Sequence, residues 1–370
     1  MSEMSRRECF RATCRFENTG RFAQMEHGFW DETFERYRRE GMPESVILPD
    51  FFKASRGDMF DYFHVLKCGY LRPYIYMNPP LETVVLEETD TSIVTRDGNG
   101  VTLRTSKTSA SLPQELDFLI RDFDSYRQYR DHLTAPDIHD RYGDIIAEAI
   151  EGYRNQQDYA AVCTHMDGFF AYPRGLMGVV NMMYQFYDDP DFMHTLLNDR
   201  AEFYIKVYEP ILQQIKPDYA FIWEDMCFKN GPLVSPAIFE EFMLPAYRKV
   251  ISFLHDFGVT NVIVDSDGDV TKLLPLWLKA GVTGLLPFEV QAGMDVVRLG
   301  EEFPDLIICG GINKLAMFGG KAEIDEELKR VLPAMARRGG YIPSLDHWVP
   351  PEISLESFTY YCEKVQSFRW

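Results

Sequence analysis

Acidic side chains follow three short apolar runs in the central part of this chain, between Asp218 and Glu289. Carboxylates in this arrangement could bind a metal ion or another cation, or could exchange protons. The runs are residues 220–223, 261–264 and 284–288, and the acidic residues after them include Glu224, Asp225, Asp265, Asp267 and Glu289. An acidic residue after a strand can instead cap the next helix. Its repetition after three runs favours a functional site.

Ionisable or amide side chains also follow other apolar runs. They are Glu26 and His27, His165 and Asp167, Asn313 and Lys314, and Asp346 and His347. The strongest candidates are Glu224, Asp265, Asp267 and His347, because they follow different runs and their oxygen and nitrogen donors suit metals such as zinc. The same carboxylates could instead bind a cationic substrate or pyrrole N–H groups. The spacing indicates no Ser–His–Asp or Cys–His catalytic group.

Some of these residues have a structural interpretation as well. His27 and His165 could be histidines of the core. Lys314 could be solvated, although a cation at the start of a helix opposes the helix dipole and so indicates a nearby anion. The aromatic loop 169–172, which contains Phe170, could line an apolar pocket or pack against a helix.

The elements that must position these side chains alternate between apolar runs and helix-like segments from residue 159 onward, which is typical of a parallel sheet. The predicted strands are residues 160–164, 220–223, 261–264, 284–288, 306–309 and 340–344. A strand near Gln24 and one before residue 83 would bring the number to about eight. We therefore predict an α/β protein with a (β/α)8 TIM barrel. An open doubly wound sheet is less favoured, because no glycine fingerprint follows the first strand.

Residues 83–108 have a different character. Three β-rich runs occur here, and the turn 97–100, which reads DGNG, is a strong hairpin signal. We predict an antiparallel meander inserted into the main sheet or placed before it. The chain is expected to form a single barrel domain over residues 1–370, with residues 45–115 as a less regular insertion.

Composition narrows the function classes. The chain has 370 residues, 46% of them hydrophobic, and a formal net charge of −19, which argues against binding to nucleic acid or to an anionic membrane. No apolar run is long enough to span a membrane, and the N-terminus lacks the apolar core of a signal peptide. The seven scattered cysteines suit reduced thiols in a cytoplasm. A homodimer is compatible with this composition but not specified by it.

Two segments resemble the uroporphyrinogen decarboxylase superfamily. The segment 339–351, GGYIPSLDHWVPP, resembles the final strand motif of that superfamily, and 234–245, VSPAIFEEFMLP, resembles the helix after a strand with an acidic end. Glu289 and the turn 310–312 also occur in the order of the superfamily. The resemblance extends over residues 155–370. It implies a (β/α)8 barrel with its site at the C-terminal mouth.

The resemblance implies one of two chemistries, and the chain departs from the motifs of both. Decarboxylases of tetrapyrrole acetate groups carry an N-terminal arginine-rich motif and a Phe-Ser-Asp segment. This chain has Glu26 and His27 in place of the arginine-rich motif, and it has no Phe-Ser-Asp segment. Methyltransferases that act with a corrinoid protein or a thiol bind zinc through His-x-Cys and a later cysteine, whereas this chain has Asp265 and Asp267. An oxygen-and-nitrogen zinc site remains. Its expected ligands are Glu224, Asp265, Asp267, Glu289 and His347.

We therefore expect a metal-assisted methyltransferase that moves a methyl group from a small methyl ether or methylamine to a corrinoid protein. The expected catalytic residues are His347, Glu224 and Asp346, and the expected substrate-binding residues are His27, Glu26, His165, Asp167, Phe170, Arg174 and Lys314. The first alternative is a decarboxylase without cofactor, in which Arg174 or Lys314 would bind the acid groups of the substrate. The second is a non-catalytic barrel that binds a corrinoid partner or another ligand.

Overall fold

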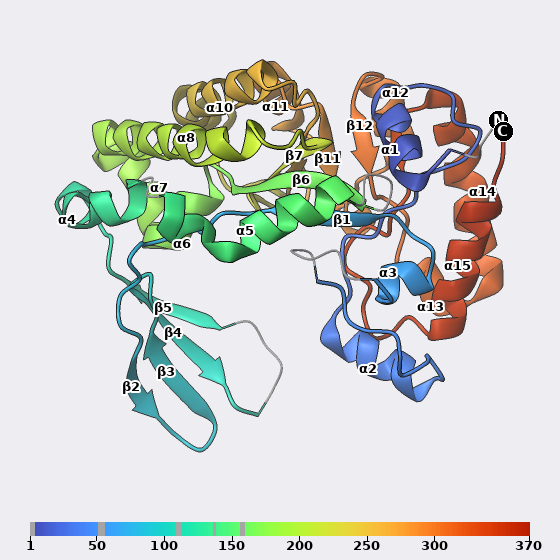
Figure 1. Ribbon diagram of the computed structural model, residues 1–370, viewed down its shortest axis with the longest axis horizontal. Coiled ribbons are helices and arrows are strands. Elements are labelled where there is room, and N and C mark those ends of the chain that lie inside the picture. The colour runs from blue at the N-terminus through green and yellow to red at the C-terminus, as the bar shows by residue number, and fades with distance from the viewer. Residues whose placement is uncertain (1–3, 51–55, 109–112, 136–137, 156–159) are drawn as a thin grey trace.

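The main element of the structure is a curled parallel sheet. The computed structural model describes residues 4–50, 56–108, 113–135, 138–155 and 160–370 (Figure 1). In sheet order the seven strands are β1 (Lys67–Leu71), β6 (Ala160–Asp167), β7 (Tyr219–Trp223), β10 (Val262–Asp265), β11 (Gly284–Leu286), β12 (Ile307–Cys309) and β13 (Tyr341–Ile342). All neighbouring pairs are parallel. The six strands predicted between residues 160 and 344 are therefore confirmed.

A short segment at Met25 connects the two edges of this sheet. The Met25 N–H donates to the carbonyl of Pro343, just after β13, at 3.1 Å, and the Leu66 N–H, just before β1, donates to the carbonyl of Gln24 at 2.8 Å. Met25 also forms a parallel bridge with Leu66. The architecture is thus TIM-barrel-like. At the place of the predicted strand near Gln24 there is one bridging residue, and the strand predicted before residue 83 is β1.

Helices surround the parallel sheet (Figure 1). The first group is α1 (Arg6–Cys14), α2 (Asp31–Arg39), α3 (Met59–Tyr62), α4 (Phe123–Thr134), α5 (Ile138–Asn155), α6 (Ala171–Met177), α7 (Val179–Asp188) and α8 (Pro190–Leu212). The second is α9 (Pro236–Ile238), α10 (Leu244–Asp256), α11 (Leu274–Ala280), α12 (Val296–Glu302), α13 (Ala316–Gly319), α14 (Lys321–Arg338) and α15 (Leu355–Ser367). None of the described helices is both long and apolar enough to cross a membrane.

Two helices begin as their cap residues predict. The Asp189 carboxylate accepts a hydrogen bond from the Phe192 N–H, and Pro190 occupies the first turn of α8. Ser235 accepts from the Ile238 N–H in the same way, one residue before Pro236 begins α9. A π-helical turn over Phe239–Met243 and α10 continue from α9, and a 3-10 turn over Val290–Ala292 follows β11.

The predicted meander is a separate antiparallel sheet. Its strands are β2 (Val84–Glu88), β3 (Ser92–Arg96), β4 (Val101–Ser106) and β5 (Gln114–Phe118), paired in that order. It is inserted between β1 and β6 and projects from the helices that cover the main sheet (Figure 1). The range 45–115 includes β1, which belongs to the main sheet rather than to the insertion.

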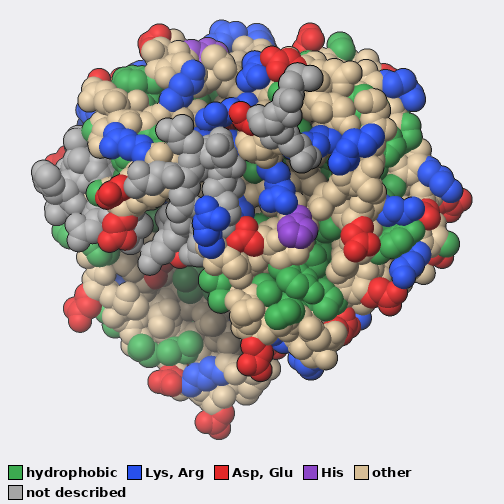
Figure 2. Space-filling model, turned by 45° about the vertical axis from the view of Figure 1, so that its right-hand side comes forward, with side chains coloured by type: hydrophobic (Ala, Val, Ile, Leu, Met, Phe, Trp, Pro, Cys, Tyr) green, Lys and Arg blue, Asp and Glu red, His purple; other side chains and the backbone are tan. Residues whose placement is uncertain are grey.

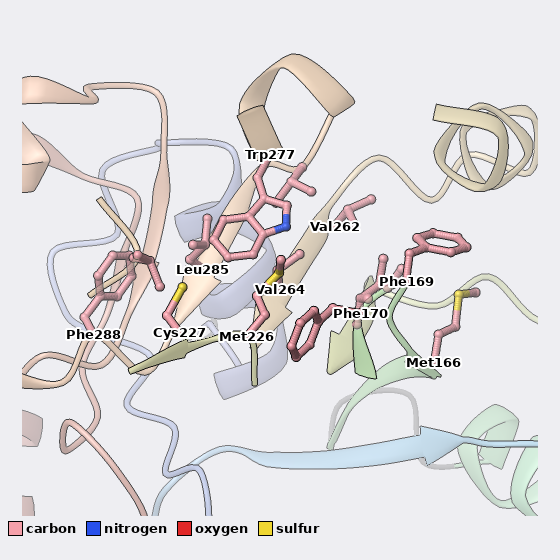
Figure 3. Close-up of a cluster of buried hydrophobic side chains, with 14 of the residues drawn as sticks. Met166, Phe169, Phe170, Met226, Cys227, Val262, Val264, Trp277, Leu285 and Phe288 are labelled. Atoms are coloured by element: carbon pink, nitrogen blue, oxygen red, sulfur yellow. The ribbon is translucent and has the colours of Figure 1, made fainter. Parts of the chain in front are cut away.

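Successive strand residues pack into two different cores. Val262 and Val264 pack on the helix-covered side, where Trp277 of α11 is fully buried among Val262, Val264 and Leu285 (Figure 3). Ile263, between the two valines, belongs instead to the cluster enclosed by the curled sheet. This alternation follows from the pleat of a strand. All seven cysteines are buried and free.

Glu26 connects the Met25 segment to the C-terminal part of the chain. Its carboxylate is only 3% exposed and accepts hydrogen bonds from the Leu345 N–H, the Ser344 hydroxyl, the Tyr361 hydroxyl and the Gln24 amide, at 2.9–3.2 Å. Burial raises the pKa of Glu26 to about 7, although these donors oppose the shift. We predict substrate binding by Glu26, but the structure places it in this buried network, outside the residues that line the cavity described below.

Because the Glu26 pKa is raised from its ordinary value of 4.5 to about 7, the folded state binds more protons than the unfolded state between these pH values. The free energy of unfolding should therefore fall as pH rises through this window, by about 3 kcal/mol from this group. Urea unfolding of the wild type and Glu26→Gln from acid to neutral pH isolates the effect, because other titrating groups cancel in the difference. A pH-independent difference would contradict the raised pKa.

Candidate active site

A cavity of about 650 Å³ opens at the C-terminal ends of the parallel strands. Its wall is lined by His27, Trp30, Tyr70, Arg72, Tyr76, His165, Phe221, Trp223, Asp225, Asp265, Asp267, His347 and Trp348. The lining combines aromatic rings with a small number of ionisable groups, a composition typical of a small-molecule site. Acidic and basic side chains are interspersed on the molecular face shown in Figure 2, so the negative net charge does not form one acidic patch there.

Two histidine–aspartate pairs lie in this cavity. The Nε2 atom of His27 is 3.4 Å from an Asp265 carboxylate oxygen, and the Nε2 atom of His347 is 3.4 Å from an Asp267 carboxylate oxygen. Both pairs join residues that are distant in sequence. All four residues follow apolar runs in the sequence, and the structure brings the four together.

The first pair favours its neutral form. Burial lowers the pKa of His27 to about 4, and the nearby His347 adds to this effect. Burial also raises the pKa of Asp265 well above its ordinary range, and repulsion from Asp225 and Asp267 raises it further. The surroundings of this pair therefore favour an uncharged imidazole and a protonated carboxyl group, which can donate a proton.

The second pair favours its charged form. Burial alone would lower the pKa of His347, but the hydrogen bond and the charge of Asp267 raise it above its ordinary value. Burial alone would raise the pKa of Asp267, but His347, His27 and Lys314 lower it. Opposite pKa shifts in adjacent carboxyl groups are a feature of acid–base sites, because one group stays ionised while the other carries a proton.

Two groups of side chains in or beside the cavity have ligand atoms close enough to share a cation, and Glu289 is the member of these groups that does not line the cavity. In the first, one donor atom each from Asp267, Glu289 and His347 lies within 4.8 Å of the others, and all three residues are half-buried. In the second, Asp225, Asp265 and Asp267 satisfy the same condition. The first group offers two carboxylates and one imidazole, which is a donor set that suits zinc. Asp267 belongs to both groups.

The Glu289 carboxylate is held between two neighbours. One of its oxygens accepts a hydrogen bond from the Gly268 N–H at 2.9 Å, and the other lies 3.8 Å from the Lys314 ammonium. Lys314 therefore has the local anion that its position at a helix start indicates. It contacts Glu289 and is not among the residues that line the cavity.

Glu224 does not face the cavity, although we predict a catalytic and metal-binding role for it. Its carboxylate is fully buried and accepts hydrogen bonds from the N–H groups of Phe169, Phe170 and Ala171 at 2.8–3.0 Å and from the Tyr247 hydroxyl. It therefore binds the free N–H groups at the start of α6. Asp225, the next residue, enters the cavity instead, and burial raises its pKa to about 6.

Asp346 also has a structural position rather than the expected one in the site. Its fully buried carboxylate accepts hydrogen bonds from the Val290 and Lys314 N–H groups, both at 3.0 Å. It thereby joins the loop after β11 to the loop after β12. His347, the next residue, lines the cavity.

The remaining predicted substrate-binding residues are divided between the cavity and its surroundings. His165 lines the cavity, and its buried Nδ1 atom has no hydrogen-bond partner among the described residues. Asp167 and Arg174 line a smaller adjacent cavity of about 130 Å³, which shares Tyr76 and Trp223 with the larger one. Phe170 is fully buried in the core and does not line either cavity.

Asp225 and Arg72 line the cavity but are not among the catalytic, substrate-binding or metal-binding residues predicted from the sequence. Asp225 has a positive φ of 47°, an unfavourable conformation for an aspartate, and Arg174 donates to its carbonyl at 2.8 Å. Arg72 follows β1 by one residue and lies on the same strand face as Tyr70. The alternation of β-strand side chains would have placed Asp225 and Arg72 inward. The bounds of β1, however, are not clear from its composition.

Comparisons with known proteins show the family to which the chain belongs. A family model described as uroporphyrinogen decarboxylase (URO-D) matches residues 100–368. The chain is similar to uroporphyrinogen decarboxylases from Geobacter metallireducens (31% identity, covering 36% of this chain and 38% of the relative) and Trichlorobacter lovleyi (33% identity, covering 34% and 36%). The aligned part thus spans little more than a third of these curated relatives.

One solved structure is similar in fold to this chain over nearly its whole length. It is a methyltransferase from Methanosarcina mazei, with a TM-score of 0.64, 14% sequence identity, and coverage of 99% of both chains. At this identity the likeness supports the fold alone.

Because the fully buried Glu224 carboxylate accepts hydrogen bonds from three backbone N–H groups, we expect Glu224→Ala to lower the free energy of unfolding by about 3 kcal/mol or more. Tyr247→Phe removes one donor from the same carboxylate and should cost about 1 kcal/mol. Urea unfolding measures both losses. A small loss for Glu224→Ala, accompanied by loss of metal binding, would instead support the ligand role predicted from the sequence.

Proposed function

The chain belongs to the uroporphyrinogen decarboxylase family, and from this premise we propose that it is a metal-assisted methyltransferase. It would move a methyl group from a small methylated donor, such as a methyl ether or methylamine, to a corrinoid carried by a partner protein. The single observation that carries this proposal is the group of Asp267, Glu289 and His347, two of which line the cavity.

These three side chains would hold a zinc ion. Their donor atoms lie within 4.8 Å of one another, and carboxylate oxygens with an imidazole nitrogen are common zinc ligands. Bound zinc would act as a Lewis acid toward the atom that loses the methyl group. His347 would bind as the neutral imidazole, so zinc would take the place of the proton that Asp267 now stabilises on the ring.

Asp265 supplies a proton in this proposal. In transfer from a methyl ether, a reduced corrinoid on the partner protein would accept the methyl group by supplying the electron pair of the new bond to carbon. The carbon–oxygen bond breaks, and its electron pair stays on oxygen. The protonated Asp265 carboxyl group, 3.4 Å from His27, can neutralise the developing alkoxide, which lowers the barrier to bond cleavage.

The aromatic lining suits a small donor with an apolar surface. Trp30, Trp223 and Trp348 line the cavity together with Tyr70 and Phe221, and its volume of about 650 Å³ is within the range of small-molecule sites. Such walls exclude water from the methyl group and strengthen the electrostatic interactions within the cavity.

Decarboxylation is the second candidate, supported by the names of the curated relatives. In that case no metal is needed, and the protonated Asp265 would deliver a proton to the carbon that loses CO₂. The charge of the cavity favours this candidate less. Among the described residues that line it, Arg72 is the single arginine or lysine, whereas a tetrapyrrole with many carboxylates would need several cations.

Elemental analysis of the purified protein tests the metal proposal. We expect about one zinc per chain in the wild type after loading at neutral pH, and loss of zinc in Asp267→Asn and in His347→Ala. Glu115→Gln is the matched control, because this carboxylate lines the smaller cavity and should not affect zinc. Formation of a methylated corrinoid from methyl ethers, followed anaerobically by absorbance, then tests the transfer itself.

If the wild type contains no zinc after incubation with zinc at neutral pH, the proposed mechanism is contradicted. Zinc that persists in both Asp267→Asn and His347→Ala would place the ion elsewhere in the chain. After either result, decarboxylation of pyrrolic acids would be the first activity to assay.

A further inference from the structure

The charged groups of the main cavity are unevenly distributed. Asp225 follows β7, and Asp265 and Asp267 lie at the end of β10 and after it, whereas Arg72 follows β1. In the sheet, β1 is separated from β10 by β6 and β7. The cavity therefore has a carboxylate-rich side and a side that carries a guanidinium group.

Arg72 retains hydrogen-bonding capacity toward the cavity. One of its terminal nitrogens donates to the Tyr76 hydroxyl at 2.7 Å, and the same nitrogen lies 3.5 Å from an Asp167 oxygen, at the outer limit for a hydrogen bond. No other described residue accepts a hydrogen bond from Arg72. Since a guanidinium has five N–H donors in a planar arrangement, Arg72 can still bind a carboxylate through two parallel hydrogen bonds.

Asp167 does not remove this capacity. Its carboxylate forms an ion pair with Arg72 at 3.5 Å, but Asp167 lines the smaller cavity and not the larger one. The side chain of Arg72 remains 27% exposed, compared with 5% for Asp167. The positive group is thus more accessible to a ligand than its negative partner.

Three rings that line the cavity pack against one another on the side of Arg72. The His165 ring centroid is 4.9 Å from the Tyr70 ring and 4.9 Å from the Phe221 ring, and Tyr70 and Phe221 are nearly parallel at 22°. Burial and the nearby Arg72 lower the pKa of His165 well below its ordinary value, so its ring is uncharged. Because Tyr70, His165 and Phe221 line the cavity, a planar ligand in it can make stacking or edge contacts with their rings.

We propose that the substrate is an aromatic acid bearing the methyl group, whose carboxylate binds Arg72 while its ring lies against Tyr70, His165 and Phe221. This orientation directs the methylated atom toward Asp265 and the group of Asp267, Glu289 and His347. The inference rests on the proposed methyl transfer for the role of the methyl group, but the carboxylate site of Arg72 can be tested by binding alone.

The test compares 4-methoxybenzoate with 4-methoxybenzamide, which has the same ring and methyl ether but no charge. Isothermal titration calorimetry measures the binding of both to the full chain, with zinc and after chelation. We expect the wild type to bind the acid at least about tenfold more tightly than the amide in both states, because a charge-assisted pair is added only for the acid.

Arg72→Met should abolish the preference for the acid, and Arg72→Lys should retain part of it, since lysine keeps the charge but loses the planar pair of donors. Arg127→Met, which removes an exposed arginine of α4, is the matched control and should leave the preference unchanged. Circular dichroism of each variant establishes that it is folded.

Three outcomes would overturn the inference. They are equal binding of acid and amide by the wild type, a preference that survives Arg72→Met, and no binding of the acid at millimolar concentration. A preference that disappears on chelation would also overturn it, because the carboxylate would then bind zinc. Failure of methyl transfer with the preference intact would instead contradict the proposed function and leave the Arg72 site in place.

Discussion

Neighbouring side chains on a β-strand point to opposite faces of the sheet, and the arrangement of this cavity depends on that constraint. In β7, Phe221 and Trp223 face inward while Ala220 and Ile222 pack toward the helices. Residues just beyond the strand continue the pattern, so Asp225 enters the cavity and Glu224 turns toward α6. The same division separates the members of two other adjacent pairs, Glu26 from His27 and Asp346 from His347. In each pair one residue lines the cavity, and the other fixes the backbone around it.

The buried carboxylates of Glu26, Glu224 and Asp346 thus determine where the cavity residues lie. Each accepts backbone N–H groups from a segment remote in sequence, and each is almost inaccessible to water. A buried carboxylate is costly unless several donors satisfy it, so these contacts define one arrangement of the loops. The loops after β11 and β12, joined through Asp346, in turn carry Glu289 and the segment that contains Lys314. Precise placement of donor atoms is what a metal or proton-transfer site requires.

Two pairs with the same geometry acquire opposite charge states from their surroundings. Asp265 is nearly inaccessible to water and has two other carboxyl groups nearby, so the proton is favoured on it. Asp267 is more exposed and has His347 and Lys314 as cationic neighbours, so its charge is favoured. The same cavity can therefore hold a proton donor beside an ionised ligand. Arg72, at the other side, gives the cavity a polarity that the net charge of −19 does not indicate.

The sequence alone determined the six main-sheet strands β6, β7, β10, β11, β12 and β13, the antiparallel insertion, the family, and the strand ends at which ionisable residues gather. These features are local, since they depend on apolar runs, turn residues and short motifs. The same local signals predicted four residues of the site, because each follows an apolar run: His27, Asp265, Asp267 and His347. Only the tertiary structure decided which member of each adjacent pair faces the cavity, because this depends on the strand register and on partners such as Tyr247 and Tyr361 from distant helices. It also decided the charge states, because burial and the proximity of other carboxylates exist only after the strands are brought side by side.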